Sequence, residues 1–351
     1  MKTQPLSIPV AAPSKPFCWI ADFPAPSPHL KALLEQKLTC TVVSHGRRIP
    51  PRWRPWRRQL AYLGLAVFLL LTRNQYKGVF CIQQFIALYA CYFASRLRLA
   101  LPPMFLQPLI YVPRPGLFGQ LWRHLFSTAL GHPALQIAFC HSQSEIETYR
   151  NLFPAAAAKF RPLRFVIDPL PPSGEPAAPP YLFSAGTSCR DYATLFEAAR
   201  RLPPGFPPIR IACKPADVQN LVPPPTVVLH HDLWAQPFRA ALAGASLVII
   251  PLQPIPVSAG QLVFLQAMSA GRPIIATRTP TSSEFLDDAC AWLVPPRDPD
   301  ALAAAIQEAL EHPEMARQKA AAAQARFAAG HTSEALSRQC VSDIAAAMPA
   351  P

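Results

Sequence analysis

The sequence predicts an α/β protein of two domains, each a parallel sheet covered by helices, that face a central cleft. Its 351 residues are more than one hydrophobic core usually serves. Short apolar runs of strand length alternate with stretches of helical length, which is typical of parallel sheets with helices on their faces. Residues 168–180 contain six prolines in thirteen positions and predict a semi-rigid hinge between the two halves.

The N-terminal domain is predicted to span residues 1–167. Its strands are expected where short runs are rich in β-branched and aromatic residues. These runs are residues 17–21, 39–44, 78–82, 108–112 and 135–140. Helices are expected over the apolar run 60–71, in the apolar stretch after residue 82, and over 117–130.

The C-terminal domain is predicted to span residues 181–330, and its pattern is sharper. Strands are expected at residues 181–186, 208–213, 226–231, 247–252, 272–279 and 291–296, and helices at 192–202, 238–243 and 259–270. Residues 331–351 predict a last helix that packs back on the N-terminal domain. Ligands of open α/β sheets bind beyond the carboxyl ends of the strands, so the site is expected there, in the cleft.

Positive charge is concentrated in the first half of the chain. Residues 1–167 hold 20 Lys and Arg against 4 Asp and Glu, a net charge of +16, whereas residues 168–351 have a net charge of −3. The twelve-residue run 60–71 is too short to cross a bilayer, which takes about 20 residues. A basic and aromatic segment precedes this run, and its side chains are Arg52, Trp53, Arg54, Trp56, Arg57 and Arg58. They predict contact with an anionic membrane surface, and the alternative is a core helix with a solvated basic entry.

Cysteine spacing and the absence of familiar motifs exclude several classes of protein. The nine cysteines include no CxxC pair, which favours reduced thiols in a cytosolic setting over a zinc site or a disulfide framework. Prolines interrupt the first thirty residues, so a secretory signal is not expected. The sequence has no GxxxxGK[ST] loop, no GxSxG elbow and no HExxH, and no GxGxxG follows the first strand. We therefore expect a cytoplasmic protein that can lie peripherally on the inner face of the cell membrane.

One segment carries a family resemblance. Residues 258–277, SAGQLVFLQAMSAGRPIIAT, resemble the donor-binding helix and following strand of the family 4 glycosyltransferases, which have the GT-B fold of two Rossmann-like domains. The matching positions include Gln266-Ala267-Met268 and Gly271-Arg272-Pro273. Residues 184–202 resemble the first strand, basic loop and helix of the family's C-terminal domain, and residues 295–314 resemble its terminal helices. The likeness covers residues 181–330 well and the N-terminal half in outline.

The residues of this segment suit an anionic donor. A helix beginning near Ser258 to Gly260 offers free backbone N–H groups and the positive end of a dipole to a diphosphate. Ser258 can cap that helix, Gly260 allows close approach of the backbone, and Arg190 and Lys214 can supply cations. The resemblance implies that the base lies near His230 and His231 and that Gln266 contacts the ribose. The predicted donor-binding set is Gly186, Thr187, His230, His231, Ala259, Gly260, Gln261, Leu262 and Gln266, and the predicted catalytic set is Arg190, Lys214 and Ser258.

Three departures from the family pattern stand out. The family most often has two carboxylates eight positions apart, and this chain has the neutral Ser258 and Gln266. The family's Gly-Arg pair is Gly186-Thr187 here, so Arg190 is left to supply the cation. Pro113 and Arg114 stand where a histidine is expected. These changes predict a divergent subfamily or a member with weakened chemistry.

Each predicted site residue also has an ordinary structural interpretation. Ser258 could be only a helix cap, Arg190 part of an ordinary first helical turn, and Lys214 a solvated loop charge. His230 and His231 could hold a metal, but no third ligand stands at standard spacing, so no metal is expected.

The resemblance implies a hexosyltransferase-type enzyme. It would transfer a sugar from a UDP- or GDP-sugar with retention of configuration, with no cofactor besides this donor, to an acceptor bound by the basic domain. A lipid-linked saccharide in bacterial exopolysaccharide or cell-envelope biosynthesis is the expected acceptor. The alternatives are a non-catalytic GT-B-like partner protein and a basic protein that binds nucleic acid.

Overall fold

The computed structural model describes residues 14–23, 25–46, 48–50, 53–163, 165–170, 176–187, 189–255 and 258–349. The described residues form two compact units. The first contains those of Met1–Leu109, Pro113–Phe139 and Val341–Pro351, and the second contains Ile110–Val112 and those of Cys140–Cys340. Arg52 and part of the predicted hinge, residues 171–175, lie outside the described residues.

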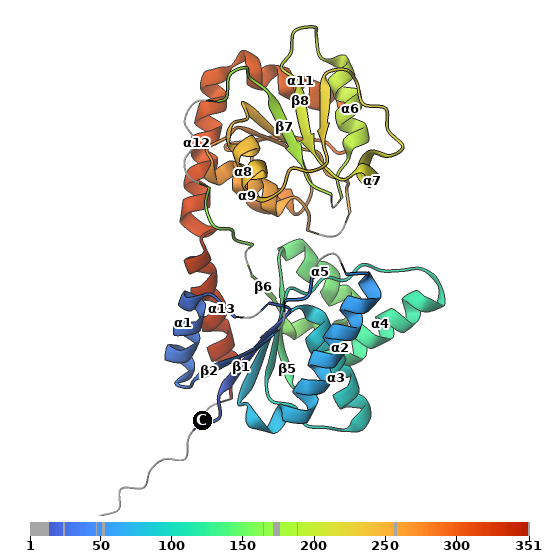
Figure 1. Cartoon of the computed structure of the whole chain (residues 1–351), viewed down its shortest axis with the longest axis vertical. Helices are drawn as coiled ribbons and strands as arrows, with labels where there is room; N and C mark the ends of the chain where they lie inside the picture. Colours follow the sequence, from blue (N-terminus) through green and yellow to red (C-terminus); the bar gives the residue numbers. More distant parts are fainter. Residues whose placement is uncertain are drawn as a thin grey trace, which may run out of the picture. The chain divides into compact units, whose positions relative to one another are not determined.

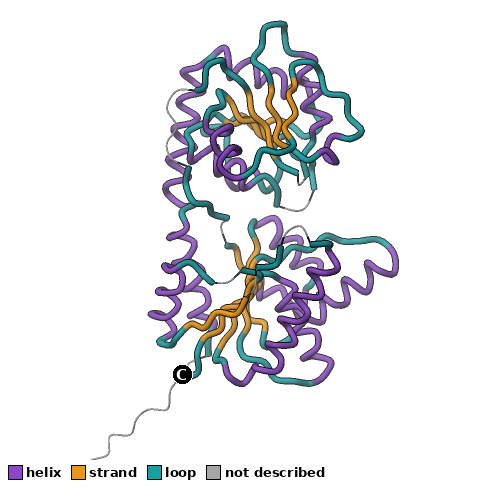
Figure 2. The backbone as a smooth tube through the Cα atoms, in the orientation of Figure 1, coloured by secondary structure: helices purple, strands orange, loops and turns teal. Residues whose placement is uncertain are grey.

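The first sheet has six strands in the order β2-β1-β3-β4-β5-β6, and the pairs from β2 to β5 are parallel. The strands are β1 (Phe17–Ala21), β2 (Val42–Gly46), β3 (Gly78–Ile82), β4 (Met104–Gln107), β5 (Leu135–Cys140) and β6 (Phe160–Pro162). Every residue of β1 is buried, as expected for a central strand covered on both faces. Figure 2 shows the strands of each sheet gathered among their own helices.

Three of the strands predicted in this half, at residues 17–21, 78–82 and 135–140, are confirmed. The strand expected at 39–44 begins later, because Thr39 takes a left-handed conformation that ends the preceding helix. The strand expected at 108–112 is wrong. Strand β4 lies at Met104–Gln107 instead, and it ends there because Pro108 has no backbone N–H to donate to a sheet.

The helices of this half are α1 (Pro28–Leu38), α2 (Pro55–Thr72), α3 (Gln84–Leu97), α4 (Gly116–Gly131) and α5 (Gln143–Leu152), with short 3₁₀ helices at Arg73–Gln75 and Pro154–Lys159. Helix α3 packs between α2 and α4. The predicted helices at 60–71 and 117–130 are confirmed as parts of α2 and α4. No described helix is long and apolar enough to span a membrane.

The second sheet is entirely parallel, in the order β12-β11-β10-β7-β8-β9. Its strands are β7 (Leu182–Ala185), β8 (Ile209–Ala212), β9 (Val227–His230), β10 (Leu247–Ile250), β11 (Ile274–Thr277) and β12 (Trp292–Val294). All six lie inside the ranges that the sequence predicts.

Alternate residues of these strands face two separate hydrophobic clusters. Val248 and Ile250 face the cluster under α9 (Gln261–Ser269) and α12 (Pro313–Gly330), whereas Leu247 and Ile249 face the one under α6 (Tyr192–Arg201) and α11 (Pro299–Glu311). Figure 1 shows this arrangement, with α6 and α11 on one side of the sheet and α8 (Ala235–Ala243), α9 and α12 on the other. Short helices α7 (Pro215–Val218) and α10 (Ser282–Phe285) complete this part.

The last helix, α13 (Ser333–Ala347), begins among residues of the second unit, and its residues from Val341 onward belong to the first. A Cβ added at Gly78 in β3 would lie 3.1 Å from Met348 Sδ, so the end of the chain packs against the first sheet. All six strands of the first sheet precede residue 167 and all six of the second follow residue 181, although residues 140–167 group with the second unit.

Candidate functional site

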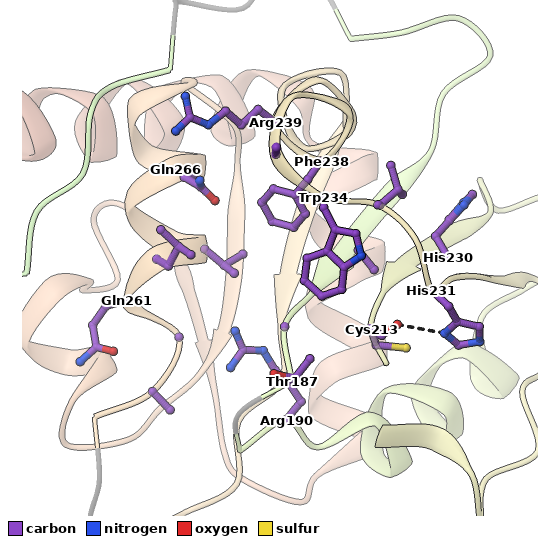
Figure 3. Close-up of a pocket in the computed structure, with 18 of the residues that line it drawn as sticks. Thr187, Arg190, Cys213, His230, His231, Trp234, Phe238, Arg239, Gln261 and Gln266 are labelled. Atoms are coloured by element: carbon purple, nitrogen blue, oxygen red, sulfur yellow. Dashed lines mark hydrogen bonds between the residues drawn. The ribbon is translucent and has the colours of Figure 1, made fainter. Parts of the chain in front are cut away.

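A cavity of about 540 Å³ opens at the carboxyl end of the second sheet. Its walls come from the segments that follow β7, β8 and β9 and from helices α8 and α9, and Figure 3 shows these side chains. The structure brings together every predicted site residue except Lys214. The predicted residues at the cavity are Gly186, Thr187, Arg190, His230, His231, Ser258, Ala259, Gly260, Gln261, Leu262 and Gln266.

The Arg190 side chain is held over the end of strand β7. Its Nε donates to the carbonyl oxygen of Ala185 at 2.7 Å, and Figure 3 shows its guanidinium directed into the cavity. A Cβ added at Gly186 would lie 2.3 Å from Arg190 Nη2, and Gly186 has a φ of +117°. Only glycine suits this position, because it accepts the left-handed φ and leaves room for the guanidinium.

Burial lowers the pKa of Arg190 from its usual value. An arginine keeps its proton even so, because its unperturbed pKa lies so far above neutral pH. Arg190 therefore brings a permanent, partly desolvated positive charge to the cavity wall. A charge in that setting attracts an anion more strongly than an arginine in open solvent does.

Helix α9 begins at this cavity, and its N-cap is Gly260, with a φ of +88°. The first N–H groups of a helix have no partner within the helix, and the dipole makes this end positive. Gly260 and the first residues of α9, Gln261 and Leu262, line the cavity together with Arg190. The geometry therefore offers an anion both backbone N–H groups and a guanidinium.

The expectation that Ser258 caps this helix is wrong. Its backbone N–H donates to Glu145 Oε1 at 2.9 Å, and its hydroxyl donates to Ser142 Oγ at 2.8 Å. Both bonds of Ser258 are therefore made to residues of α5 and its N-cap, and not to α9. The N-cap of α9 is Gly260, which has no side chain to bond the first N–H groups of the helix. Ser258 still lines the cavity, so the bonds hold the turn that leads into α9.

Glu145 is a functional candidate that sequence reasoning missed. It is 2% exposed and also accepts from the backbone N–H of His141 at 3.0 Å, and burial raises its pKa. Its own N–H donates to Ser142 Oγ at 3.1 Å. The Ser-x-x-Glu spacing of Ser142 and Glu145 is a helix-start signal, and it could have marked α5 but not its contact with Ser258.

Three buried polar atoms of cavity-lining residues have no hydrogen-bond partner among the described residues, and one of them is Gln261 Nε2 in the first turn of α9. Gln266 is 6% exposed and its Oε1 has no hydrogen-bond partner among the described residues, and the same holds for His230 Nε2. Unpaired buried polar atoms are costly and uncommon. These atoms therefore provide hydrogen-bonding groups at the cavity wall that the rest of the described chain does not use.

Aromatic side chains form the remaining wall. Trp234, just before α8, and Phe238 within it line the cavity beside His231, whose Nδ1 lies 2.9 Å from the carbonyl oxygen of Cys213. Sequence reasoning missed Trp234 and Phe238. The signal available was an aromatic pair close after the predicted strand at 226–231, which a planar base could stack on.

Lys214 lies apart from this group. It is exposed, it precedes α7, and its backbone N–H donates to Asp217 Oδ2 at 2.8 Å. Among the described residues, no cluster of three His, Cys, Asp or Glu side chains could hold a metal ion.

In the first unit, the basic segment before α2 is well exposed where it is described. Trp53, Arg54, Trp56 and Arg57 are exposed, and the Arg57 guanidinium lies 5.3 Å from the centre of the Trp56 ring. Arg58 is half-buried and donates from Nη2 to the hydroxyl of Tyr62 at 3.0 Å. Four of the six predicted membrane-contact residues are therefore available to a partner.

Comparison with known proteins agrees with this architecture. Residues 210–312 match the family described as glycosyl transferases group 1. No curated protein sequence matches the chain. HepE of Anabaena, solved with UDP-glucose, superposes with a TM-score of 0.66 at 15% identity, over 94% of this chain and 99% of that one.

Two further structures are similar to the chain over nearly its whole length. Sucrose-phosphate synthase from Thermosynechococcus elongatus has a TM-score of 0.65 at 17% identity, over 93% of this chain and 97% of that one. The lipopolysaccharide outer core galactosyltransferase WaaB has a TM-score of 0.60 at 11% identity, over 94% and 99%. The chain therefore has the GT-B glycosyltransferase fold, and its residues 210–312 match the group 1 glycosyl transferases, which supports a transferase.

Proposed function

We propose that this protein transfers a sugar from a nucleotide diphosphate sugar to an acceptor. The observation that carries the proposal is the meeting of the Arg190 guanidinium and the N-terminus of α9 at one cavity. A diphosphate carries its negative charge on several oxygens, and a guanidinium and helix N–H groups together match that distribution. The cavity volume of about 540 Å³ is in the range of small-molecule sites.

The unpaired atoms and the aromatic wall suit the rest of such a donor. Gln266 Oε1 can accept a hydrogen bond from a ribose hydroxyl, and Trp234 can stack on a base. In this proposal the base lies beside His230 and His231, which line the cavity. UDP and UDP-glucose are bound in the HepE structures, so a UDP-sugar is the first donor to test, with a GDP-sugar as the alternative.

In the proposed reaction, an acceptor hydroxyl attacks the anomeric carbon while the bond from that carbon to the diphosphate oxygen breaks. A diphosphate oxygen takes the proton of the hydroxyl, and the new bond forms on the face that the diphosphate leaves, with retention. Arg190 and the α9 N–H groups stabilise the charge that develops on the diphosphate, with no metal ion involved. Lys214 is exposed and does not line the cavity, so it has no role in this proposed reaction.

The acceptor side of the proposal rests on charge. The net charge of +16 on residues 1–167 and the exposed Trp53, Arg54, Trp56 and Arg57 favour an acceptor at an anionic membrane. We infer that the acceptor is a lipid-linked saccharide of bacterial exopolysaccharide or envelope assembly. This protein would bind the acceptor while it lies peripherally on the cytoplasmic face of the membrane.

A binding protein without activity is the second candidate, because Ser258 and Gln266 replace carboxylates with neutral groups. Ser258 is moreover bonded to Glu145 and Ser142. Donor binding without sugar release would favour this candidate.

The test is thermal denaturation with UDP-glucose, UDP and a GDP-sugar, followed by assay of UDP or GDP release. We expect one nucleotide class to raise the melting temperature of the wild type and not that of Arg190→Ala. Arg317→Ala is the matched control, since it removes an exposed arginine of α12 that does not line the cavity. If no nucleotide stabilises the wild type, or if Arg190→Ala responds like the wild type, the proposal is wrong.

A further inference from the structure

A second cavity, of about 670 Å³, lies in the first unit between the end of β2 and helix α2. Its wall on α2 consists of small and apolar residues, Ala61, Gly64, Leu65 and Phe68. A Cβ added at Gly64 would meet no atom within 4 Å outside its own helix backbone among the described residues. Gly64 therefore leaves the groove open along one side of the helix.

The other wall mixes polar side chains with the apolar Ile49 and Trp53. It includes Ser44, His45 and Arg48 from the end of β2 and the segment after it. His45 is held by a hydrogen bond of 3.0 Å between its Nε2 and the hydroxyl of Tyr76, and its ring packs 4.9 Å from that of Phe68. Arg48 is exposed at the edge of the groove. The groove is thus apolar along one side and cationic at its edge.

The apolar wall continues onto the solvent-facing side of α2. Leu60, Val67 and Leu71 are 58%, 44% and 77% exposed, and they follow one another at helical spacing with Gly64 between them. The opposite side of α2, with Tyr62, Ala66 and Leu69, is buried. A helix that is apolar on all sides is expected to be covered on all sides, so an apolar partner belongs on this face.

Charge indicates which partner this is. Residues 36–144, which supply every side chain that lines the groove, contain thirteen Lys and Arg and no Asp or Glu. The carboxylate of Asp22 contacts α2 on its buried side, where it accepts a hydrogen bond from Tyr62. A second copy would bring a like-charged surface against α2, which repels. A lipid with an anionic head and a hydrocarbon tail complements both the positive edge and the apolar wall.

We propose that this groove binds a membrane lipid phosphate, with the hydrocarbon chain along Ala61, Gly64 and Phe68 and the phosphate at Arg48. The inference rests on the proposed function, because it identifies where the lipid part of a lipid-linked acceptor would lie. It adds a binding site on a different sheet from the donor cavity. The groove is also at the carboxyl end of its strand, which is where open α/β sheets bind ligands.

Gly64→Leu is the decisive variant, because a Cβ at this groove-lining position would have no other atom within 4 Å among the described residues. Leucine is also a better helix former than glycine, so the variant should melt at the wild-type temperature or above it. Gly131→Leu is the matched control. Gly131 ends α4, and a Cβ there also meets nothing within 4 Å among the described residues.

The measurement is titration calorimetry of the full-length protein with dodecyl phosphate below its micelle concentration. Inorganic phosphate and dodecyl maltoside are the two comparison ligands. We expect dodecyl phosphate to bind the wild type and Gly131→Leu equally, and Gly64→Leu and Arg48→Ala at least about tenfold more weakly, as a difference of about 1.4 kcal/mol would produce. Each comparison ligand should bind the wild type more weakly than dodecyl phosphate.

Several outcomes would overturn the proposal. They are unchanged binding by Gly64→Leu, inorganic phosphate binding as tightly as dodecyl phosphate, or a wild-type dimer that Gly64→Leu converts to monomers. UDP-glucose stabilisation measured on the same variants separates the two proposals. Donor binding that survives without lipid binding refutes only the groove, and lipid binding without any nucleotide binding refutes only the proposed function.

Discussion

Gly186 decides where the Arg190 guanidinium can lie. Any larger residue would place a Cβ 2.3 Å from Arg190 Nη2, and its φ of +117° suits glycine alone. The position of the Arg190 guanidinium therefore depends on the absence of a side chain at residue 186. Replacing Gly186 with alanine tests this dependence.

Gly186→Ala should lower the free energy of unfolding by about 1–3 kcal/mol through backbone strain and should also abolish donor binding by displacing Arg190. Gly205→Ala is the control, since Gly205 also has a positive φ, +94°, but a Cβ there meets nothing within 4 Å among the described residues. Urea denaturation and UDP-glucose titration measure the two effects. Equal donor affinity in both variants would contradict the assignment of Arg190.

Glu145 gives the protein a pH-dependent contact at the turn before α9. Burial raises its pKa above the ordinary value of 4.5, so the folded state holds the proton more tightly than the unfolded state. Its contribution to stability is therefore full below pH about 4.5 and is lost as the pH rises through the folded-state pKa. Glutamine in its place has no such dependence.

We expect the free energy of unfolding of Glu145→Gln, measured relative to that of the wild type, to increase as the pH rises above about 4.5. Urea denaturation over a series of pH values measures the difference. Glu147→Gln, which changes an exposed carboxylate on the same helix, is the control. A difference between Glu145→Gln and wild type that is constant with pH would show that Glu145 does not titrate in this way.

At the scale of the element, α9 is a buried helix for which we propose a donor-binding role. All but one of its nine residues are buried, and Gln266 is the polar residue whose side-chain oxygen has no partner among the described residues. A structural helix in this position would carry an apolar residue there. An apolar residue at position 266 should therefore raise the free energy of unfolding and weaken donor binding.

Gln266→Met should raise the free energy of unfolding by about 1 kcal/mol, because it removes a buried amide oxygen that has no partner among the described residues. It should also weaken UDP-glucose binding by about tenfold, since the ribose would lose one hydrogen bond. Thermal denaturation with and without donor measures both effects. Loss of stability together with unchanged binding would indicate a purely structural amide.

At the scale of the whole molecule, the uneven charge is the dominant feature. Exposed Arg54 and Arg57 stand beside Trp53 and Trp56 at the start of α2, within a stretch of chain that lacks acidic residues. Each arginine near an anionic membrane contributes about 1 kcal/mol, and the attraction falls with ionic strength. Membrane association is therefore expected to depend on both charge and salt.

The double variant Arg54→Ala/Arg57→Ala should bind vesicles containing phosphatidic acid about 10- to 100-fold more weakly than the wild type at low salt. Sedimentation with vesicles measures this, and vesicles of phosphatidylcholine alone should show no difference. Arg317→Ala/Arg338→Ala, which removes two exposed arginines of the C-terminal helices, is the matched control. Equal loss in both double variants would mean that only total charge matters.

Much of the second sheet could be predicted from sequence, because strands such as Leu247–Ile250 are short apolar runs and α6 has apolar residues at helical spacing. The grouping of Arg190, Gly260 and Gln266 also followed from sequence, since carboxyl ends of neighbouring parallel strands meet at one edge. Helix α1 and strand β4 were missed or misplaced, because proline-rich flanks conceal where the regular backbone begins.

The amino-acid order by itself determined the class of fold, the basic character of the first half and the segment proposed to bind the donor, because these depend on local periodicity, charge and motif spacing. Only the tertiary structure decided that Ser258 bonds to Glu145 instead of capping α9, that Lys214 lies away from the cavity, and that Gly64 opens a groove beside His45. Each of these depends on residues far apart in the chain, and their side-chain directions are set by packing that no local pattern encodes.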